Sequence, residues 1–205
     1  MLVDGVTWSC PTPAEHASLR HLPHELAELL TQRNGFILRG GALHVRGAVS
    51  APLWHSLERH WTGELAMSAL YPSIPSTHVP FAQDCVGDQF LLHQGQVSRL
   101  DGETGELEPL NVDLAGFIDQ AVDFPDELLR ATPLEELLRR AGQLHPGQLI
   151  HAYPPFCVAA KVAPSLRAVA SDQVLRAHAR LAAELRNTPD GTPVRIRPPS
   201  LGDTT

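Results

Sequence analysis

Cysteine is scarce in this sequence, and long apolar runs are missing from it. The 205 residues include three cysteines, Cys10, Cys85 and Cys157, which lie far apart without paired spacing. A disulfide framework or a zinc ribbon needs more cysteines at closer spacing, so we expect single buried thiols. No run approaches the ~20 apolar residues of a membrane span. The first residues also lack the basic region and apolar core of a signal peptide. These absences predict a cytoplasmic protein.

Sequence signatures of catalysis are missing as well. The chain has no G-x-S-x-G elbow, P-loop, dinucleotide fingerprint, deaminase motif or zincin motif. Asp84 and Asp88 lie near Cys85, and their charge would raise the pKa of its thiol and weaken it as a nucleophile. The 11 histidines form no cluster with cysteine or carboxylate at metal-ligand spacing. We therefore expect no catalytic residue, no metal ligand and no cofactor.

Positive charge is missing from one stretch of thirty residues. Residues 100–129 contain nine acidic and no basic side chains, whereas the whole chain has a net charge of −7. Such a run is typical of a solvated face. The alternative is a docking surface for a basic protein, which would raise the association rate more than the affinity. A negative chain does not favour nucleic acid as a direct partner.

Local signals place the secondary structure and predict the fold class. Helices are expected from the capping box at 12–15, after Pro23 to 34–35, after Asp113, around 134–138 and over 172–186. Strands are expected at 36–38, 43–45, 88–93, 96–100, 106–110 and 194–196. Helices thus precede and follow a block of strands, which favours α+β. We expect one domain over residues 1–197, with a central, largely antiparallel mixed β-sheet packed by helices, and a flexible tail at 198–205.

Residues 51–78 are rich in proline and serine, and their order is harder to predict. They are expected to be irregular around a short helical piece. Trp54 and Trp61 lie seven residues apart there and would share one face of a helix. Tryptophans at helical spacing usually pack inward, so the core is the favoured place for both; the alternative is that they are hot-spot residues of a binding surface.

Two groups of short motifs resemble a known family. VPFAQD at 79–84, followed by GDQF at 87–90, resembles the central signature of the SUKH superfamily of Smi/Knr-type proteins. PPFC at 154–157 and PDG at 189–191 are similar to a bacterial, immunity-protein-like subgroup. The resemblance extends over residues 22–197.

The resemblance implies an α+β fold and a role in binding. Many bacterial members are immunity proteins that neutralise a toxin, often a nuclease or deaminase, by direct contact. Other members are regulatory or scaffolding proteins. The family has no recognised catalytic residues, so none can be assigned to this chain.

Charge and resemblance together predict a non-enzymatic protein-binding module that acts as an immunity protein. Its partner would be a basic protein toxin or another protein. We expect neither direct nucleic-acid binding nor membrane binding. The alternatives are a regulatory or scaffold protein with an endogenous partner and, less favoured, an enzyme or metal-binding protein. The predicted partner-binding residues are Asp101, Glu103, Glu106, Glu108, Asp84 and Asp88. For Asp84 and Asp88, capping of a turn is an equally simple explanation.

Overall fold

Seven antiparallel strands in sequence order form the main sheet. The computed structural model describes residues 4–189, 191 and 192, and each strand pairs with the next along the chain. The strands are β1 (Val6–Ser9), β2 (Phe36–Leu38), β3 (Leu43–Val45), β4 (Val79–Asp84), β5 (Gln89–His93), β6 (Gln96–Leu100) and β7 (Leu107–Pro109). A smaller antiparallel sheet consists of β8 (Gln148–Tyr153) and β9 (Ser165–Ala170). This arrangement confirms the predicted α+β class and the antiparallel sheet at its centre.

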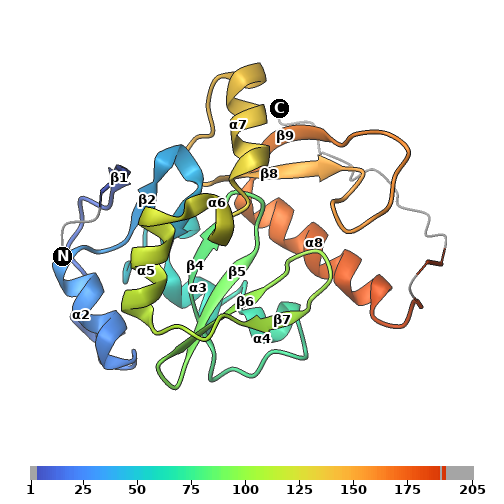
Figure 1. Ribbon diagram of the computed structural model, residues 1–205. Coiled ribbons are helices and arrows are strands. Elements are labelled where there is room, and N and C mark those ends of the chain that lie inside the picture. The colour runs from blue at the N-terminus through green and yellow to red at the C-terminus, as the bar shows by residue number, and fades with distance from the viewer. Residues whose placement is uncertain (1–3, 190, 193–205) are drawn as a thin grey trace.

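Helices cover both faces of the main sheet. They are α1 (His16–Leu19), α2 (His24–Gln32), α3 (Leu57–Trp61), α4 (Met67–Leu70), α5 (Leu114–Asp123), α6 (Pro125–Leu128), α7 (Ala131–Ala141) and α8 (Ser171–Leu185), with 3-10 turns η1 (Arg39–Gly41) and η2 (Leu53–His55). In β5, Phe90 and Leu92 pack with α2, α5 and α7, whereas Leu91 packs with α4 and α8. Successive side chains of a strand point to opposite faces, so the sheet lies between two helical layers. Figure 1 shows α5 in front of the sheet and α8 running diagonally beside it. Within the described residues, no helix has the length and apolar character needed to cross a membrane.

The helix predicted after Asp113 forms as expected. Oδ1 of Asp113 accepts a hydrogen bond from the backbone N–H of Gly116 at 2.8 Å. This bond satisfies one of the N–H groups that a helix start leaves without a partner. The i, i+3, i+4, i+7 spacing predicts an apolar stripe, and all four of its positions are buried: Leu114, Phe117, Ile118 and Ala121.

Removing this cap should weaken the fold measurably. We expect Asp113→Ala to lower the free energy of unfolding by about 1 kcal/mol, because the N–H of Gly116 loses its acceptor. Asp113→Asn keeps an acceptor oxygen at the same place and should retain most of the stability. Urea unfolding of the three proteins measures the difference. No loss in the alanine variant would show that the cap contributes nothing, and equal losses in both variants would show that the acceptor oxygen is not the source of the stability.

The capping box predicted at Thr12 is wrong. Helix α1 begins at His16. The Glu15 side chain does not reach back toward Thr12; it accepts hydrogen bonds from the backbone N–H and hydroxyl of Ser50 at 2.8 and 2.9 Å. A contact between distant parts of the chain therefore outcompetes the local cap.

The two tryptophans do not share a helix face. Trp54 lies in η2 and Trp61 ends α3, and both are half-buried. The ring centroid of Trp54 lies 5.1 Å from that of Trp8 and 5.1 Å from that of His44. The indole N–H of Trp61 instead donates to the carbonyl of Ser76 at 2.8 Å. The chain bends between η2 and α3, which separates the two rings.

The buried stripe of α8 is rotated relative to the prediction. Apolar spacing along residues 172–186 predicts inward positions at Val174, Ala177, Leu181 and Leu185. Val174 is buried, but the other three are half-buried. The buried positions are Ser171, Val174, Leu175, His178, Ala179 and Ala182. Two polar residues, Ser171 and His178, thus occupy inward positions, and a pattern based on apolar residues cannot include them.

Four strands, β1, β4, β8 and β9, are absent from the predicted set, and one predicted strand cannot be compared. The N–H of Ile150 in β8 donates to the carbonyl of Cys85 at 2.7 Å. This bond joins the small sheet to the end of β4. The predicted strand at 194–196 and the tail at 198–205 lie outside the described residues. Cys85 is buried as expected, but Cys10 is half-buried and Cys157 is exposed, and all three are free thiols.

Candidate functional site

The six residues predicted to bind a partner divide into an interior and a surface group. Three are buried, each with 4% of its surface exposed or less: Asp84, Asp88 and Glu103. The other three reach solvent at least in part: Asp101, Glu106 and Glu108. The interior group therefore contacts its own chain, and a partner can reach the surface group directly.

The interior group is built around Asp84, the last residue of β4. Its Oδ1 accepts hydrogen bonds from the backbone N–H groups of Val86, Gly87 and Asp88 at 3.0, 2.9 and 3.0 Å. Burial, followed by the charge of Asp88, raises the pKa of Asp84 to about 8, because the ionised carboxylate loses its hydration. Hydrogen bonds from the backbone N–H groups lower this pKa, but their effect is smaller than that of burial. Asp84 thus caps the turn between β4 and β5, which is the structural role that the sequence left open.

Arg130, at the start of α7, connects two carboxylates. Its Nε lies 3.1 Å from Oδ2 of Asp88, and its Nη2 lies 2.7 Å from Oδ2 of Asp101. Oδ1 of Asp88 accepts a hydrogen bond from the backbone N–H of Gly102 at 3.0 Å. Burial raises the pKa of Asp88 to about 6, although the charge of Arg130 opposes the shift. Arg130 and Asp88 together fix the β4–β5 turn, the β6–β7 loop and the start of α7 relative to one another.

Glu103 extends this network to a fourth segment. Its two carboxylate oxygens accept hydrogen bonds from the backbone N–H groups of Phe156 and Cys157 at 3.1 and 2.7 Å. Burial and the charge of Glu103 raise the pKa of the Cys157 thiol to about 12. The thiol therefore stays protonated near neutral pH and is a weak nucleophile.

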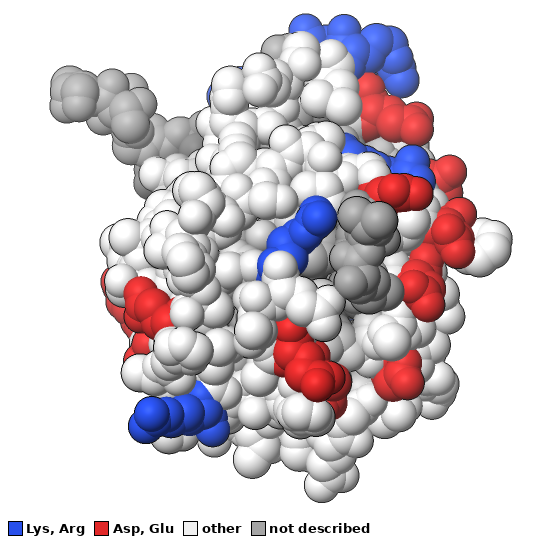
Figure 2. Space-filling model, turned by 90° about the vertical axis from the view of Figure 1, so that its left-hand side faces the viewer, with Lys and Arg blue, Asp and Glu red and all other residues white. Residues whose placement is uncertain are grey.

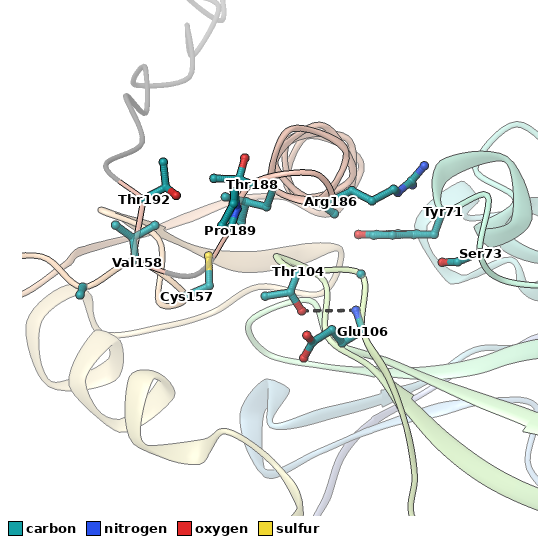
Figure 3. Close-up of a pocket in the computed structure, with 15 residues that line it drawn as sticks. Tyr71, Ser73, Thr104, Glu106, Cys157, Val158, Arg186, Thr188, Pro189 and Thr192 are labelled. Carbon is teal, nitrogen blue, oxygen red and sulfur yellow. Dashed lines mark hydrogen bonds between the residues drawn. The ribbon is translucent and has the colours of Figure 1, made fainter.

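A pocket of about 950 Å³ lies beside the network. Figure 3 shows its walls: Thr104 and Glu106 from the β6–β7 loop, Cys157, and Arg186 after the end of α8. Tyr71 closes one side and donates its hydroxyl to the carbonyl of Gly102 at 2.8 Å. The carboxylates with raised pKa do not line this pocket. The groups best suited to acid–base chemistry and the space that could hold a small molecule are therefore separate features.

A chain of buried polar side chains, which sequence reasoning missed, crosses the sheet. Nη2 of Arg46 donates to Oε1 of Gln83 at 2.6 Å, and Nε2 of Gln83 lies 3.4 Å from Nδ1 of His44. Nε2 of His44 lies 2.8 Å from Nδ1 of His55. Nε2 of His55 lies 3.1 Å from the carbonyl of Asn34. Arginine can only donate and a carbonyl can only accept, so both histidines carry their proton on Nε2.

This polar chain is buried, although His44 and Gln83 also line a pocket of about 220 Å³. Arg46 is fully buried, and burial lowers its pKa to about 9. His44 and Arg46 lie two residues apart at the end of β3, and His44 pairs with Gln83 across the sheet. A histidine and an arginine at this spacing in a predicted strand are the signal that could have revealed it. The described residues contain no group of three or more His, Cys, Asp or Glu side chains that could hold a metal ion.

Two members of the surface group, Glu106 and Glu108, belong to a larger set of exposed acids, which we call the acidic face. We define this face by the exposed carboxylates of β7, α5 and their flanking residues: Glu106, Glu108, Asp113, Asp119, Asp123 and Asp126. A shallow hollow of about 540 Å³ along β7 is lined in part by Asp101, Glu106 and Glu108. Arg99 also lines it and pairs with Glu108 at 2.6 Å. In Figure 2 acidic side chains follow the right-hand edge of the molecule, with basic side chains among them near the top, and further acidic side chains lie at the lower centre and the left-hand edge.

Comparisons with known proteins add no relative. No protein-family model, curated protein or solved structure was found to match the chain. The resemblance to the SUKH superfamily stays a prediction from the motifs described above.

Proposed function

We propose that this protein is a non-enzymatic binding module that neutralises a basic protein toxin, of nuclease or deaminase type, by direct contact. The observation that carries the proposal is the acidic face. Nuclease surfaces that hold phosphates are basic, and an acidic inhibitor surface would attract them and speed the encounter.

The arrangement of the charges supports a contact surface in particular. Among the described residues, Asp119, Asp123 and Asp126 have no ion-pair partner, so their charges are available to another molecule. The segment from 100 to 129 contains no basic side chain that would offset them. Charges of one sign grouped on one face create a stronger local field than the same charges dispersed over the surface.

The interior network gives this surface a fixed shape. Asp101 lies in the hollow of the acidic face, and its Oδ2 is held by Nη2 of Arg130 at 2.7 Å. Its Oδ1 accepts hydrogen bonds from the backbone N–H groups of Glu103 and Thr104, both at 2.9 Å. A surface ordered before binding loses less conformational entropy when the complex forms. Asp84, Asp88 and Glu103 thus contribute to binding by supporting the residues that a partner touches.

Growth rescue tests the proposal. Basic nuclease and deaminase toxin domains are expressed one at a time in a bacterial host, with or without this protein. We expect rescue against one toxin. We expect the triple variant Glu106→Lys, Asp119→Lys, Asp123→Lys to lose it, with an association rate lowered about tenfold or more at low salt.

The matched control reverses three exposed acids elsewhere: Glu28, Glu135 and Glu184. It changes the net charge by the same amount and should rescue growth like the original protein. Equal behaviour of the two triple variants would remove the acidic face from the proposal. Rescue against none of the toxins, together with no complex in binding measurements, would overturn the proposed function.

A further inference from the structure

One of the six phenylalanines is exposed. Four have no exposed surface: Phe36, Phe81, Phe90 and Phe117. Phe156 is half-buried, whereas Phe124 exposes 57% of its surface. Because burying a phenylalanine stabilises a fold, an exposed one gives up much of that contribution. Phe124 also lies within the acidic segment.

The backbone holds Phe124 outward in a defined corner. Phe124 separates α5 from α6, with φ −130° and ψ 54°, and Pro125 begins α6. A proline disfavours helical backbone at the residue before it, so the chain bends at Phe124. The N–H of Phe124 donates to the carbonyl of Gln120 at 2.8 Å, and its carbonyl accepts from the N–H of Leu128 at 3.3 Å. The ring is therefore presented by two helix ends that fix its backbone on both sides.

Carboxylates flank this ring on both sides along the chain. Asp123 precedes Phe124, and Asp126 follows it by two residues. Both side chains are exposed, and neither has an ion-pair partner in the described part of the chain. Arg39, the cation that reaches this corner, donates to the carbonyl of Val122 at 2.8 Å. The corner thus carries an exposed aromatic ring with an exposed carboxylate on each side of it in the sequence.

We propose that the α5–α6 corner imitates an unstacked nucleotide, an inference that rests on the proposed function. The ring of Phe124 takes the place of a base, and the carboxylates of Asp123 and Asp126 take the place of the flanking phosphates. Proteins that bind single-stranded nucleic acid stack bases on aromatic side chains and pair phosphates with Lys or Arg. Enzymes that act on a base also draw it into a closely fitting pocket. The partner is then a basic protein that binds single strands, and the corner occupies its nucleic-acid cleft.

Other exposed apolar side chains do not offer this combination. Leu53 and Val162 expose 59% and 65% of their surfaces, but both are aliphatic and lie outside the acidic segment. Tyr153 has a ring and exposes 36% of its surface, but it lies outside residues 100–129. Leu107 lies among the exposed acids of β7 with 38% exposed, but it has no ring that could replace a base. Phe124 is therefore the residue on which the inference depends.

Displacement of an oligonucleotide tests the inference. The probes are the toxin domains used for growth rescue, each inactivated in its active site and loaded with a short fluorescent oligothymidylate. We expect this protein to release the oligonucleotide from the domain that it neutralises, as fluorescence anisotropy would show. Phe124→Ala should need about 10- to 100-fold more protein for the same release, whereas Phe124→Trp should act like the original. Leu53→Ala is the matched control, because it removes an exposed apolar side chain outside the acidic face.

The outcomes separate the inference from the proposed function. Mimicry is overturned if the protein binds a domain while the oligonucleotide stays in place, or if Phe124→Ala releases it as well as the original. The proposed function stands in both cases. If no domain binds the original protein, both fail together. Urea unfolding of Phe124→Ala should match the original, which excludes a loss of folding as the cause.

Discussion

Replacing Gly47 by alanine should lower the free energy of unfolding by at least about 3 kcal/mol. A Cβ at this position would lie 2.5 Å from Nε2 of His55 and 2.8 Å from the carbonyl oxygen of Asn34. Neither can move easily, because Nε2 of His55 and the carbonyl of Asn34 are themselves hydrogen-bonded at 3.1 Å. Gly47 is held as well: its N–H donates to the carbonyl of His55 and its carbonyl accepts from Leu57, both at 2.9 Å. Urea unfolding at neutral pH measures the loss.

Two controls separate this clash from ordinary effects of glycine. Gly142 has a φ of +84°, and a Cβ added there would meet no atom within 4 Å. Gly142→Ala should therefore cost about 1–2 kcal/mol through backbone strain alone. In a His55→Ala background the contact with the His55 ring is removed and only the one with the carbonyl oxygen of Asn34 stays, so Gly47→Ala should cost less there. An unchanged cost in that background would show that His55 is not what excludes the side chain.

Local patterns were enough to predict most of the fold. The hairpin of β2 and β3, the meander from β5 to β7 and the helices α2 and α5 follow from apolar spacing, glycine turns and one aspartate cap. Prediction failed where a distant partner decides the structure. Glu15 bonds to Ser50, and β8 forms beside β9 and the end of β4, contacts that a local window does not contain.

For the candidate site, the sequence located the acidic residues but could not show which of them are buried. Glu103 and Glu106 lie in the same turn, yet Glu103 points inward to backbone N–H groups more than fifty residues away. Glu106 is exposed. Charge alone does not distinguish them, because the difference depends on how the loop packs against the segment at 155–157. The polar chain through His44 and His55 is hidden for the same reason.

Stability should also fall steeply as the pH falls below about 6.5. Burial lowers the pKa of His55 and His178 to about 4, and those of His44 and His60 well below the usual value. Between pH 6.5 and about 4 the unfolded chain therefore binds protons at these histidines and the folded chain does not. Each such group lowers the free energy of unfolding by up to about 1.4 kcal/mol for every pH unit of acidification.

The buried carboxylates act in the opposite direction. Burial raises the pKa of Asp84 to about 8 and that of Asp88 to about 6. Between pH 4 and these raised pKa values, the folded chain keeps the protons of Asp84 and Asp88, whereas the unfolded chain has lost them. The contribution of each carboxyl group to the free energy of unfolding therefore falls as the pH rises through this range. Below pH 6.5 the four histidines change the free energy of unfolding more than the two carboxylates do. Above pH 6.5 Asp84 has the largest effect on it. The free energy of unfolding should therefore be greatest near pH 7.

Urea midpoints measured from pH 4.5 to 8.5 test this balance. Asp84→Asn imitates the protonated side chain, so it should remove most of the decline above pH 7 and leave the acid side steep. His178→Gln should make the acid side less steep, because one buried histidine no longer titrates. Its matched control is His24→Gln, since the side chain of His24 is 85% exposed, and it should leave the profile unchanged. A profile that is flat from pH 4.5 to 6.5, or one that His178→Gln and His24→Gln alter equally, would contradict the assignment of acid sensitivity to the buried histidines.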